Sequence, residues 1–261
     1  MAAVSFDLWH TLIHLAAPDE ERYMRSQLAI GAEALARASR DPNAPEVDVG
    51  ELRSAFEAEY LAAVGECHRG RTVSPAEQLL RAGARVGRYP SLERYLSELR
   101  HLVEEAPFRT APGALDLLRS LSEEGYRLAV ISNTVGEPGA FLRPVLRSMG
   151  FERYVESYTF SDELPWAKPS PEVFRKALGE LETPPSETVH AGDGWSDIEG
   201  ARRAHLRAGI LYSGLPEYGA RYQELFFPHG RTAPEAEYHA SDLEEVGRLV
   251  RTILPRPRLS P

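Results

Sequence analysis

Carboxylates follow apolar runs of this sequence at the points where predicted strands end. The first run, residues 2–6, leads into Asp7, and the run "TVHAG" leads into Asp193, with Asp197 one helical turn further on. Ligands of open α/β sheets bind beyond the carboxyl ends of the strands, so these side chains should lie close together. Mg²⁺ is usually held by one or two carboxylates together with substrate oxygens. The pattern therefore predicts a magnesium site at this edge of a sheet.

Two further segments add groups that bind phosphate. The run "RLAVI" leads into Ser132 and Asn133, and Lys168 lies in the loop before a predicted helix that begins "SPEVF". Only Lys168 and Lys176 are lysines among the 30 basic residues, so a lysine here indicates that a compact point charge is favoured over a guanidinium. Each of these residues alone also fits an ordinary turn or cap. Together, near successive strand ends, they favour a phosphate site beside the metal.

The elements that must position these groups alternate after residue 112. Strand-like runs cover residues 127–133, 154–160, 188–193 and 207–212, and helical patterns lie between them. Such alternation indicates parallel strands joined by right-handed crossovers. We therefore predict an α/β fold with a doubly wound, mostly parallel, Rossmann-like sheet, which the first apolar run also joins.

Residues 19–105 have a different pattern, with apolar residues at helical spacing throughout and no predicted strand. We expect three or four helices that form an all-helical cap domain inserted into the core. The predicted boundaries are 1–15 and 108–255 for the catalytic core, 16–107 for the cap and 256–261 for a flexible tail. The stretch 213–234 is longer than a usual connection.

Composition argues against several classes of protein. No segment approaches the ~20 apolar residues of a membrane span, and the N-terminus enters a strand without a leader, so we expect a cytoplasmic protein with no membrane partner. The net charge of −9 argues against nucleic acid, whose phosphates require clustered Lys and Arg. The single cysteine, Cys67, is expected to be an inert, half-buried thiol. The sequence leaves the oligomeric state open.

Four ordered motifs, "FDLWHTL", "LAVISNT", "WAKPSPEVF" and "HAGDGWSDIEGARRA", resemble those of the haloacid dehalogenase superfamily. Its members carry a cap between the first and second motif, and the resemblance covers nearly the whole chain. It implies that Asp7 is the nucleophile that accepts a phosphoryl group. It also implies phosphate binding by the side chains of Ser132, Asn133 and Lys168.

The same resemblance implies a Mg²⁺ cofactor held by Asp7, Asp193 and the main-chain carbonyl of Trp9, while Asp197 supports the metal or Lys168. The physical logic agrees, because a carboxylate that attacks a phosphate dianion meets like charge, which the metal and the lysine must neutralise. Covalent catalysis on the aspartate then divides hydrolysis into two steps.

The sequence departs from the superfamily's phosphatases at Trp9, where they have a second Asp that protonates the leaving group and later activates water. Such a group typically contributes ~10²- to 10⁴-fold in rate, and an indole cannot replace it. The next residue, His10, replaces a family glycine, and its imidazole is a candidate for the missing acid or base. The alternative is that His10 points toward the cap or the face of the sheet.

Three functions are compatible with this pattern. A Mg²⁺-dependent phosphatase or phosphotransferase for a small phosphorylated metabolite is favoured, because dehalogenases work without metal and have no use for Asp193. The aromatic Trp9 keeps a 2-haloacid dehalogenase open, and a catalytically weak, ligand-binding relative is the third possibility. A phosphonatase is excluded because it needs a cap lysine, and residues 16–107 contain none.

Two features bear on the substrate. All three tryptophans, Trp9, Trp166 and Trp195, lie within the motifs. They form either an aromatic wall that contacts a flat or apolar leaving group or simple packing. In the predicted cap, the candidates for contacting a second anionic group are Arg22, Arg25, Arg69 and Arg71.

Overall fold

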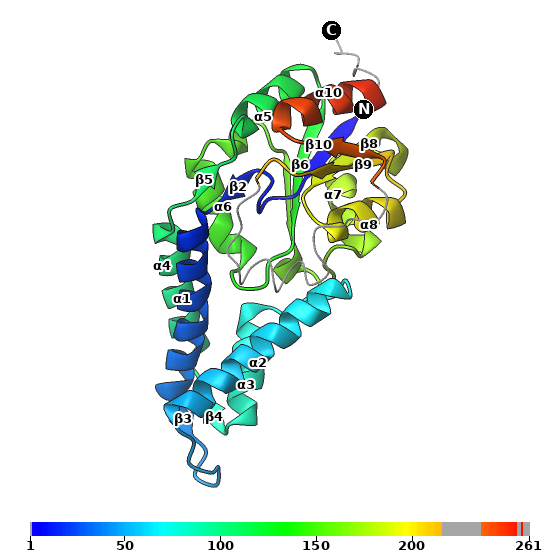
Figure 1. The fold of residues 1–261 in the computed structure, drawn as a ribbon. Helices are drawn as coiled ribbons and strands as arrows, with labels where there is room; N and C mark the ends of the chain where they lie inside the picture. The colour runs from blue at the N-terminus through cyan, green and yellow to red at the C-terminus, as the bar shows by residue number, and fades with distance from the viewer. Residues whose placement is uncertain (1, 216–235, 255–256, 258–261) are drawn as a thin grey trace.

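A sheet of six parallel strands forms the centre of the molecule in a computed structural model that describes residues 2–215, 236–254 and 257 (Figure 1). In spatial order the strands are β10 (Tyr238–Ala240), β9 (Ala208–Tyr212), β8 (Thr188–Gly192), β1 (Ala3–Phe6), β6 (Arg127–Ser132) and β7 (Ser157–Phe160). The chain runs from β1 outward through β6 and β7, and then returns to the other side of β1 with β8. The predicted doubly wound α/β sheet is confirmed, with β1 at the point where the strand order reverses.

Helices cover both faces of this sheet, because alternate residues of a strand point to opposite sides. Val4 and Phe6 of β1 belong to the larger apolar cluster, which includes residues of α5 (Ala114–Glu123), α6 (Gly139–Ser148) and α10 (Leu243–Ile253). Ala3 belongs to a second cluster with residues of α7 (Pro171–Glu180). The next helix, α8 (Trp195–Arg203), directly follows β8 and leads into β9. The sheet is therefore a buried scaffold, and its carboxyl ends can present side chains to a ligand.

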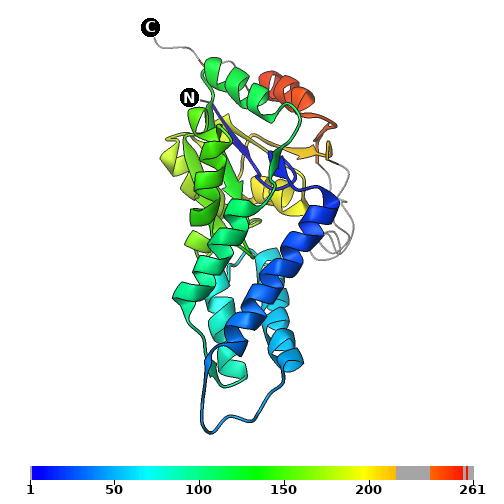
Figure 2. The same ribbon diagram turned by 90° about the vertical axis from the view of Figure 1, so that its left-hand side faces the viewer.

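Four more helices lie together beyond the sheet (Figures 1 and 2). They are α1 (Ala17–Ala36), α2 (Val49–His68), α3 (Pro75–Arg85) and α4 (Leu92–Glu105). A capping box begins α2, in which the Asp48 carboxylate accepts from the Glu51 amide at 2.8 Å and Glu51 reciprocates. Gly31 of α1 lies against the Phe56 ring of α2, and a Cβ at Gly31 would be 2.2 Å from that ring. The two longest helices can therefore pack closely.

The chain enters and leaves this helical segment at one place. The strands β2 (Ile13–His14) and β5 (Arg109–Thr110) pair antiparallel there. A second short pair, β3 (Ser39–Arg40) with β4 (Arg88–Tyr89), lies inside the segment, so the prediction of no strand in residues 19–105 is wrong. Two-residue strands are too short to leave an alternating pattern in the sequence.

Within the described residues, every helix is too short or too polar to cross a bilayer. The predicted long connection 213–234 and the predicted tail 256–261 lie outside the described residues, except at 213–215 and 257.

Candidate active site

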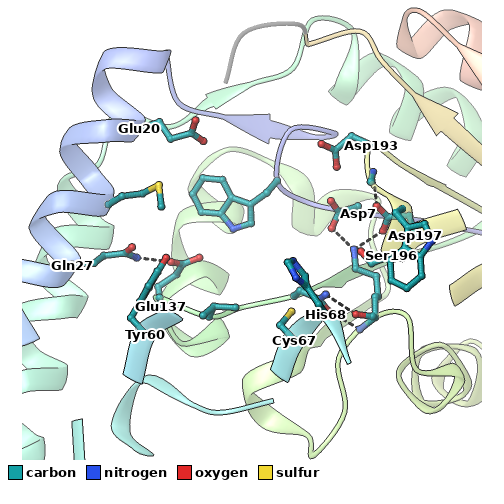
Figure 3. Close-up of a pocket in the computed structure, with 18 of the residues that line it drawn as sticks. Asp7, Glu20, Gln27, Tyr60, Cys67, His68, Glu137, Asp193, Ser196 and Asp197 are labelled. Atoms are coloured by element: carbon teal, nitrogen blue, oxygen red, sulfur yellow. Dashed lines mark hydrogen bonds and ion pairs between the residues drawn. The ribbon is translucent and has the colours of Figure 1, made fainter. Parts of the chain in front are cut away.

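Three aspartates meet at the carboxyl ends of two neighbouring strands. Asp7 directly follows β1, Asp193 directly follows β8, and Asp197 lies in the first turn of α8. Carboxylate oxygens of the three lie within 4.8 Å of one another, and all three residues are buried (Figure 3). This is the convergence that the sequence predicts, and oxygen donors of this kind suit a hard divalent cation.

Lys168 is the cation of this cluster. Its Nζ lies 2.5 Å from Asp7 Oδ1 and 2.7 Å from Asp197 Oδ1, and only 1% of the residue is exposed. Burial alone would lower the pKa of Lys168, but the charges of Asp197 and Asp7 outweigh burial and raise it. Burial raises the pKa of Asp7, and the charge of Lys168 opposes this rise. The lysine is therefore held as a positive charge directly against the predicted nucleophile.

Asp197 is held by three residues of the site. Besides Lys168, the His190 Nε2 atom lies 3.0 Å from Asp197 Oδ1, and the Gly194 amide donates to Oδ2 at 3.0 Å. Burial would raise the pKa of Asp197, but Lys168 and His190 lower it below its usual range. Because both of its oxygens are engaged, Asp197 orients Lys168.

The segment that follows β6 holds Lys168 from its main chain. The Asn133 side chain donates to the Lys168 carbonyl at 3.0 Å and accepts from the Lys168 amide at 2.7 Å. Its neighbour Ser132 has a buried hydroxyl without a hydrogen-bond partner in the structure. Asn133 thus positions the lysine, while Ser132 keeps its hydrogen-bonding capacity.

A cavity of about 120 Å³ extends from the aspartates toward the helical segment. Its far side is formed by Glu20 and Gln27 of α1, Tyr60 of α2 and Glu137, which lies between β6 and α6 (Figure 3). The volume suits a small molecule.

Trp9 lines this cavity and packs among aromatic rings. Its ring centroid lies 6.2 Å from that of Tyr23 on α1 and 5.4 Å from that of Phe108, beside β5.

Glu137 is a buried carboxyl group near this indole. Burial raises the pKa of Glu137 to about 7, and hydrogen bonds from Gln27 and the Trp9 indole oppose this rise. The tryptophan therefore connects the loop after β1 to the helical segment and to Glu137.

This geometry agrees with one family of enzymes. The family model for haloacid dehalogenase-like hydrolases matches residues 1–205. The chain belongs to this family.

Individual relatives of the hydrolase match shorter segments. Haloacid dehalogenase-like hydrolase domain-containing protein 3 of Xenopus laevis is 33% identical over 106 residues, which are 40% of this chain and 42% of that protein. Phosphoglycolate phosphatase of Pseudomonas fluorescens is 31% identical over 103 residues, which are 40% of this chain and 37% of that enzyme. The matched segments thus cover less than half of either relative.

A solved structure agrees with nearly the whole of this chain. The HAD phosphatase from Thermococcus onnurineus has a TM-score of 0.61 at 20% identity, and the match covers 99% of this chain and 100% of that one. At this identity the match shows a shared fold.

Two residues predicted for the site do not line the cavity of the hydrolase. His10 is fully buried, and its Nε2 atom lies 2.6 Å from Glu20 Oε1. Its φ of 57° is in the left-handed region, which explains why glycine suits this position in the family. Ser132 also lies outside the lining residues, next to Asn133, which does line the cavity. Asp7, Trp9, Lys168, Asp193 and Asp197 all line it.

The four arginines proposed to contact a second anionic group also lie outside the cavity lining. Arg22 pairs with Asp19, and both Arg69 and Arg71 pair with Glu66, with the three guanidinium side chains 63–72% exposed. Arg25 donates to the Glu21 carbonyl at the surface. Of the tryptophans, Trp9 and Trp195 line the cavity and Trp166 does not, so the aromatic wall is incomplete.

Sequence reasoning did not identify the side chains at the far side of the cavity. Glu20, Gln27 and Tyr60 are spread along two helices, and Glu137 lies in a connection that belongs to no motif. The same holds for His68, which projects from the end of α2 into the cavity (Figure 3). A weak signal was available, because Glu20 and Gln27 are seven residues apart and so lie on one face of a helix.

Proposed function

We propose that this hydrolase is a Mg²⁺-dependent phosphatase that acts on a small phosphorylated metabolite through a phosphoryl group carried on Asp7. The observation that carries the proposal is the contact of Asp7 with Lys168 beside Asp193, at the carboxyl ends of β1 and β8. The relatives named as phosphatases support the reaction class. The size of the cavity supports a small substrate.

The donors of the aspartate cluster fit Mg²⁺. All are carboxylate oxygens, and the oxygens of Asp197 are already engaged by Lys168, His190 and Gly194. Asp7 and Asp193 are therefore the proposed side-chain ligands, and the family resemblance adds the Trp9 carbonyl. When bound, the ion neutralises charge on the phosphate oxygens.

Hydrolysis then proceeds in two displacements at phosphorus. A carboxylate oxygen of Asp7 forms a bond to phosphorus, and the bond to the leaving oxygen breaks with its electron pair. A water molecule next attacks the phosphorus, which releases phosphate and restores the Asp7 carboxylate. Lys168 holds positive charge beside Asp7 through both steps, and Asp197 and Asn133 keep it in place. Because Trp9 cannot donate a proton to a leaving oxygen in this way, the first step should be fastest for weakly basic leaving groups.

We also propose that the helical segment acts as a cap, with the core formed by residues 1–15 and 108–255 and the cap by 16–107. Glu20, Gln27 and Tyr60 all come from this segment and line the same cavity as Asp7. A cap that closes in this way excludes water from the charged site.

Phosphate release from p-nitrophenyl phosphate tests the function. We expect turnover that requires Mg²⁺ and falls by at least about 10³-fold in Asp7→Asn and Asp193→Asn, because both groups act at the developing charge. Asp116→Asn is the matched control, because this aspartate is exposed on α5 and pairs only with Arg119 among the described residues.

Other outcomes of the assay identify the alternatives. Undiminished turnover in excess chelator, or in Asp7→Asn, contradicts the proposal. Chloride release from a 2-haloacid without metal establishes a dehalogenase. Ligand binding without metal-dependent turnover establishes a binding protein.

A further inference from the structure

The cavity of the hydrolase has two chemically different ends. Asp7 and Asp193 lie at one end, and Glu20, Gln27 and Glu137 lie at the other (Figure 3). Among the described lining residues, the basic ones are Lys168 and His68. Lys168 is held at the aspartate end by Asp7 and Asp197. The other end, which would receive the leaving group, is therefore acidic and rich in hydrogen-bond acceptors.

Glu137 is a deeply buried carboxyl group at this end. Its residue is 6% exposed, and the Gln27 Nε2 atom donates to its Oε2 at 2.7 Å. Among the described residues, no basic side chain lies within ion-pair distance of this carboxylate. A buried carboxylate with only neutral donors is costly to retain, so a group that supplies positive charge there would be bound favourably.

Two further acceptors lie next to Glu137. The Tyr23 hydroxyl is buried beside Gln27 and Glu137 and interacts with both, and its oxygen can accept a hydrogen bond. The Gln27 amide uses its nitrogen for Glu137, and its oxygen is an acceptor. Gly136 makes room for this amide, because a Cβ there would lie 2.5 Å from Gln27 Nε2 and 2.6 Å from its Oε1.

We propose that Glu137, Gln27 and Tyr23 bind a primary ammonium group on the leaving group, so that among alkyl phosphates the enzyme prefers those that carry an amino group. This proposal rests on the phosphatase function proposed above. An ammonium has three N–H donors and no acceptor, which matches a carboxylate, an amide oxygen and a hydroxyl. A carboxylate or second phosphate in the same place would face the Glu137 carboxyl group, and no arginine of the helical segment lines the cavity to offset it.

The test is a set of phosphate monoesters of similar size whose leaving groups differ in charge. It comprises 2-aminoethyl phosphate, n-propyl phosphate and 2-phosphoglycolate, together with 3-aminopropyl phosphate and n-butyl phosphate as a longer pair. We measure kcat/KM for each and its inhibition constant against p-nitrophenyl phosphate. At one length or both, kcat/KM for the amine should exceed that for its neutral counterpart by about tenfold. One charge-assisted hydrogen bond of about 1.4 kcal/mol gives this difference. The kcat/KM for phosphoglycolate should be the lowest of the set.

Two variants test the assignment of residues. Glu137→Gln removes the charge, and Gly136→Ala displaces the Gln27 amide while it leaves Glu137 unchanged. Both should reduce the ratio of amine to neutral ester toward one. Glu33→Gln, at an exposed position of α1, should keep the ratio.

The outcomes separate this proposal from the phosphatase function. Turnover of p-nitrophenyl phosphate with equal or better use of the neutral or carboxylate esters overturns the ammonium site and leaves the phosphatase intact. Absence of turnover with every ester overturns the phosphatase. If Glu137→Gln does not fold, the wild-type series and Gly136→Ala still decide, and an unchanged ratio in Gly136→Ala contradicts the role of Gln27.

Discussion

At the scale of single residues, the proposed mechanism lacks a proton donor for the leaving group at Trp9. The Trp9 residue is 8% exposed, and its indole packs between Tyr23 and Phe108, so it is a wall of the cavity. Trp9→Asp should introduce the missing acid and base. We expect steady-state hydrolysis of alkyl phosphates to rise by at least about tenfold, the lower part of what acid–base catalysis contributes. Rapid-quench kinetics with an alkyl and an aryl phosphate measure this, because the wild type should show a burst with aryl esters and slow turnover afterwards.

The variant carries a stability cost that must be measured with it. Loss of a buried tryptophan typically costs ~3–5 kcal/mol, so thermal unfolding should accompany the kinetics. Trp9→Phe is the control for packing, because it keeps an aromatic ring and adds no acid.

His10→Asn tests the other candidate for the missing acid or base, and asparagine tolerates the left-handed backbone at this position. Because His10 is buried against Glu20, we expect its replacement to lower stability and to keep the aryl to alkyl ratio; a collapse of turnover at unchanged stability would assign proton transfer to His10.

At the scale of elements, the strand ends are predictable from the sequence and the far side of the cavity is not. Asp7 and Asp193 directly follow the apolar runs that specify β1 and β8, and Lys168 lies in the loop before α7, so local pattern fixes their placement. Glu137 meets Gln27 only after α1 has packed beside the segment that follows β6, and no local spacing encodes that contact. The strand β10 was not predicted for a different reason, because its three residues are too few to show an alternating pattern.

The paired strands β2 and β5 allow a test of the proposed division into core and cap. They run antiparallel, so a hairpin turn of about four residues can replace residues 15–108. Because α5, α6, α7 and α10 already cover the sheet, we expect a folded core that retains metal-dependent turnover of p-nitrophenyl phosphate. It should lose any preference for aminoalkyl phosphates, since Glu20, Gln27 and Tyr60 are gone.

Circular dichroism and denaturant unfolding report whether this core folds. The same spliced chain with Asp7→Asn is the matched control, because its residual turnover measures background hydrolysis. A spliced chain that does not fold contradicts the proposed division into core and cap. A folded core that keeps the ammonium preference assigns the selectivity to the strand ends.

At the scale of the whole molecule, the cavity depends on how closely the helical segment sits on the core. Several contacts join them. The Gln78 side chain donates to the Val135 carbonyl at 2.7 Å, and the Ala167 amide donates to the Gly70 carbonyl at 3.0 Å. The single cysteine, Cys67, is located in the last turn of α2, where it lines the cavity and is 4% exposed, so it is more deeply buried than the sequence suggests. One thiol therefore reports on this interface.

Alkylation of Cys67 should measure how often the interface opens. Burial raises the pKa of the Cys67 thiol to about 12, against the charge of Lys168, which lowers it. At pH 8 only about one molecule in 10⁴ then carries the reactive thiolate, whereas an unfolded thiol with a pKa near 8.5 reacts readily. We expect iodoacetamide to label the native protein slowly and to label it still more slowly when Mg²⁺ and orthovanadate are present, because a ligand in the cavity holds the segments together.

Gln78→Leu supplies the opposite change. It removes the donor to the Val135 carbonyl, so the free energy of opening the interface should fall by about 1–2 kcal/mol. Labelling of Cys67 should then accelerate about 5- to 30-fold, while the unfolding midpoint of the core changes less. Cys67→Ser with Ser148→Cys provides a thiol at an exposed position of α6 and controls for direct effects of the ligand on the reagent. Rapid labelling of the wild type that ignores both the ligand and Gln78→Leu would show that Cys67 reacts without opening. The helical segment would then be a fixed wall, and substrate would have to enter past the aspartates.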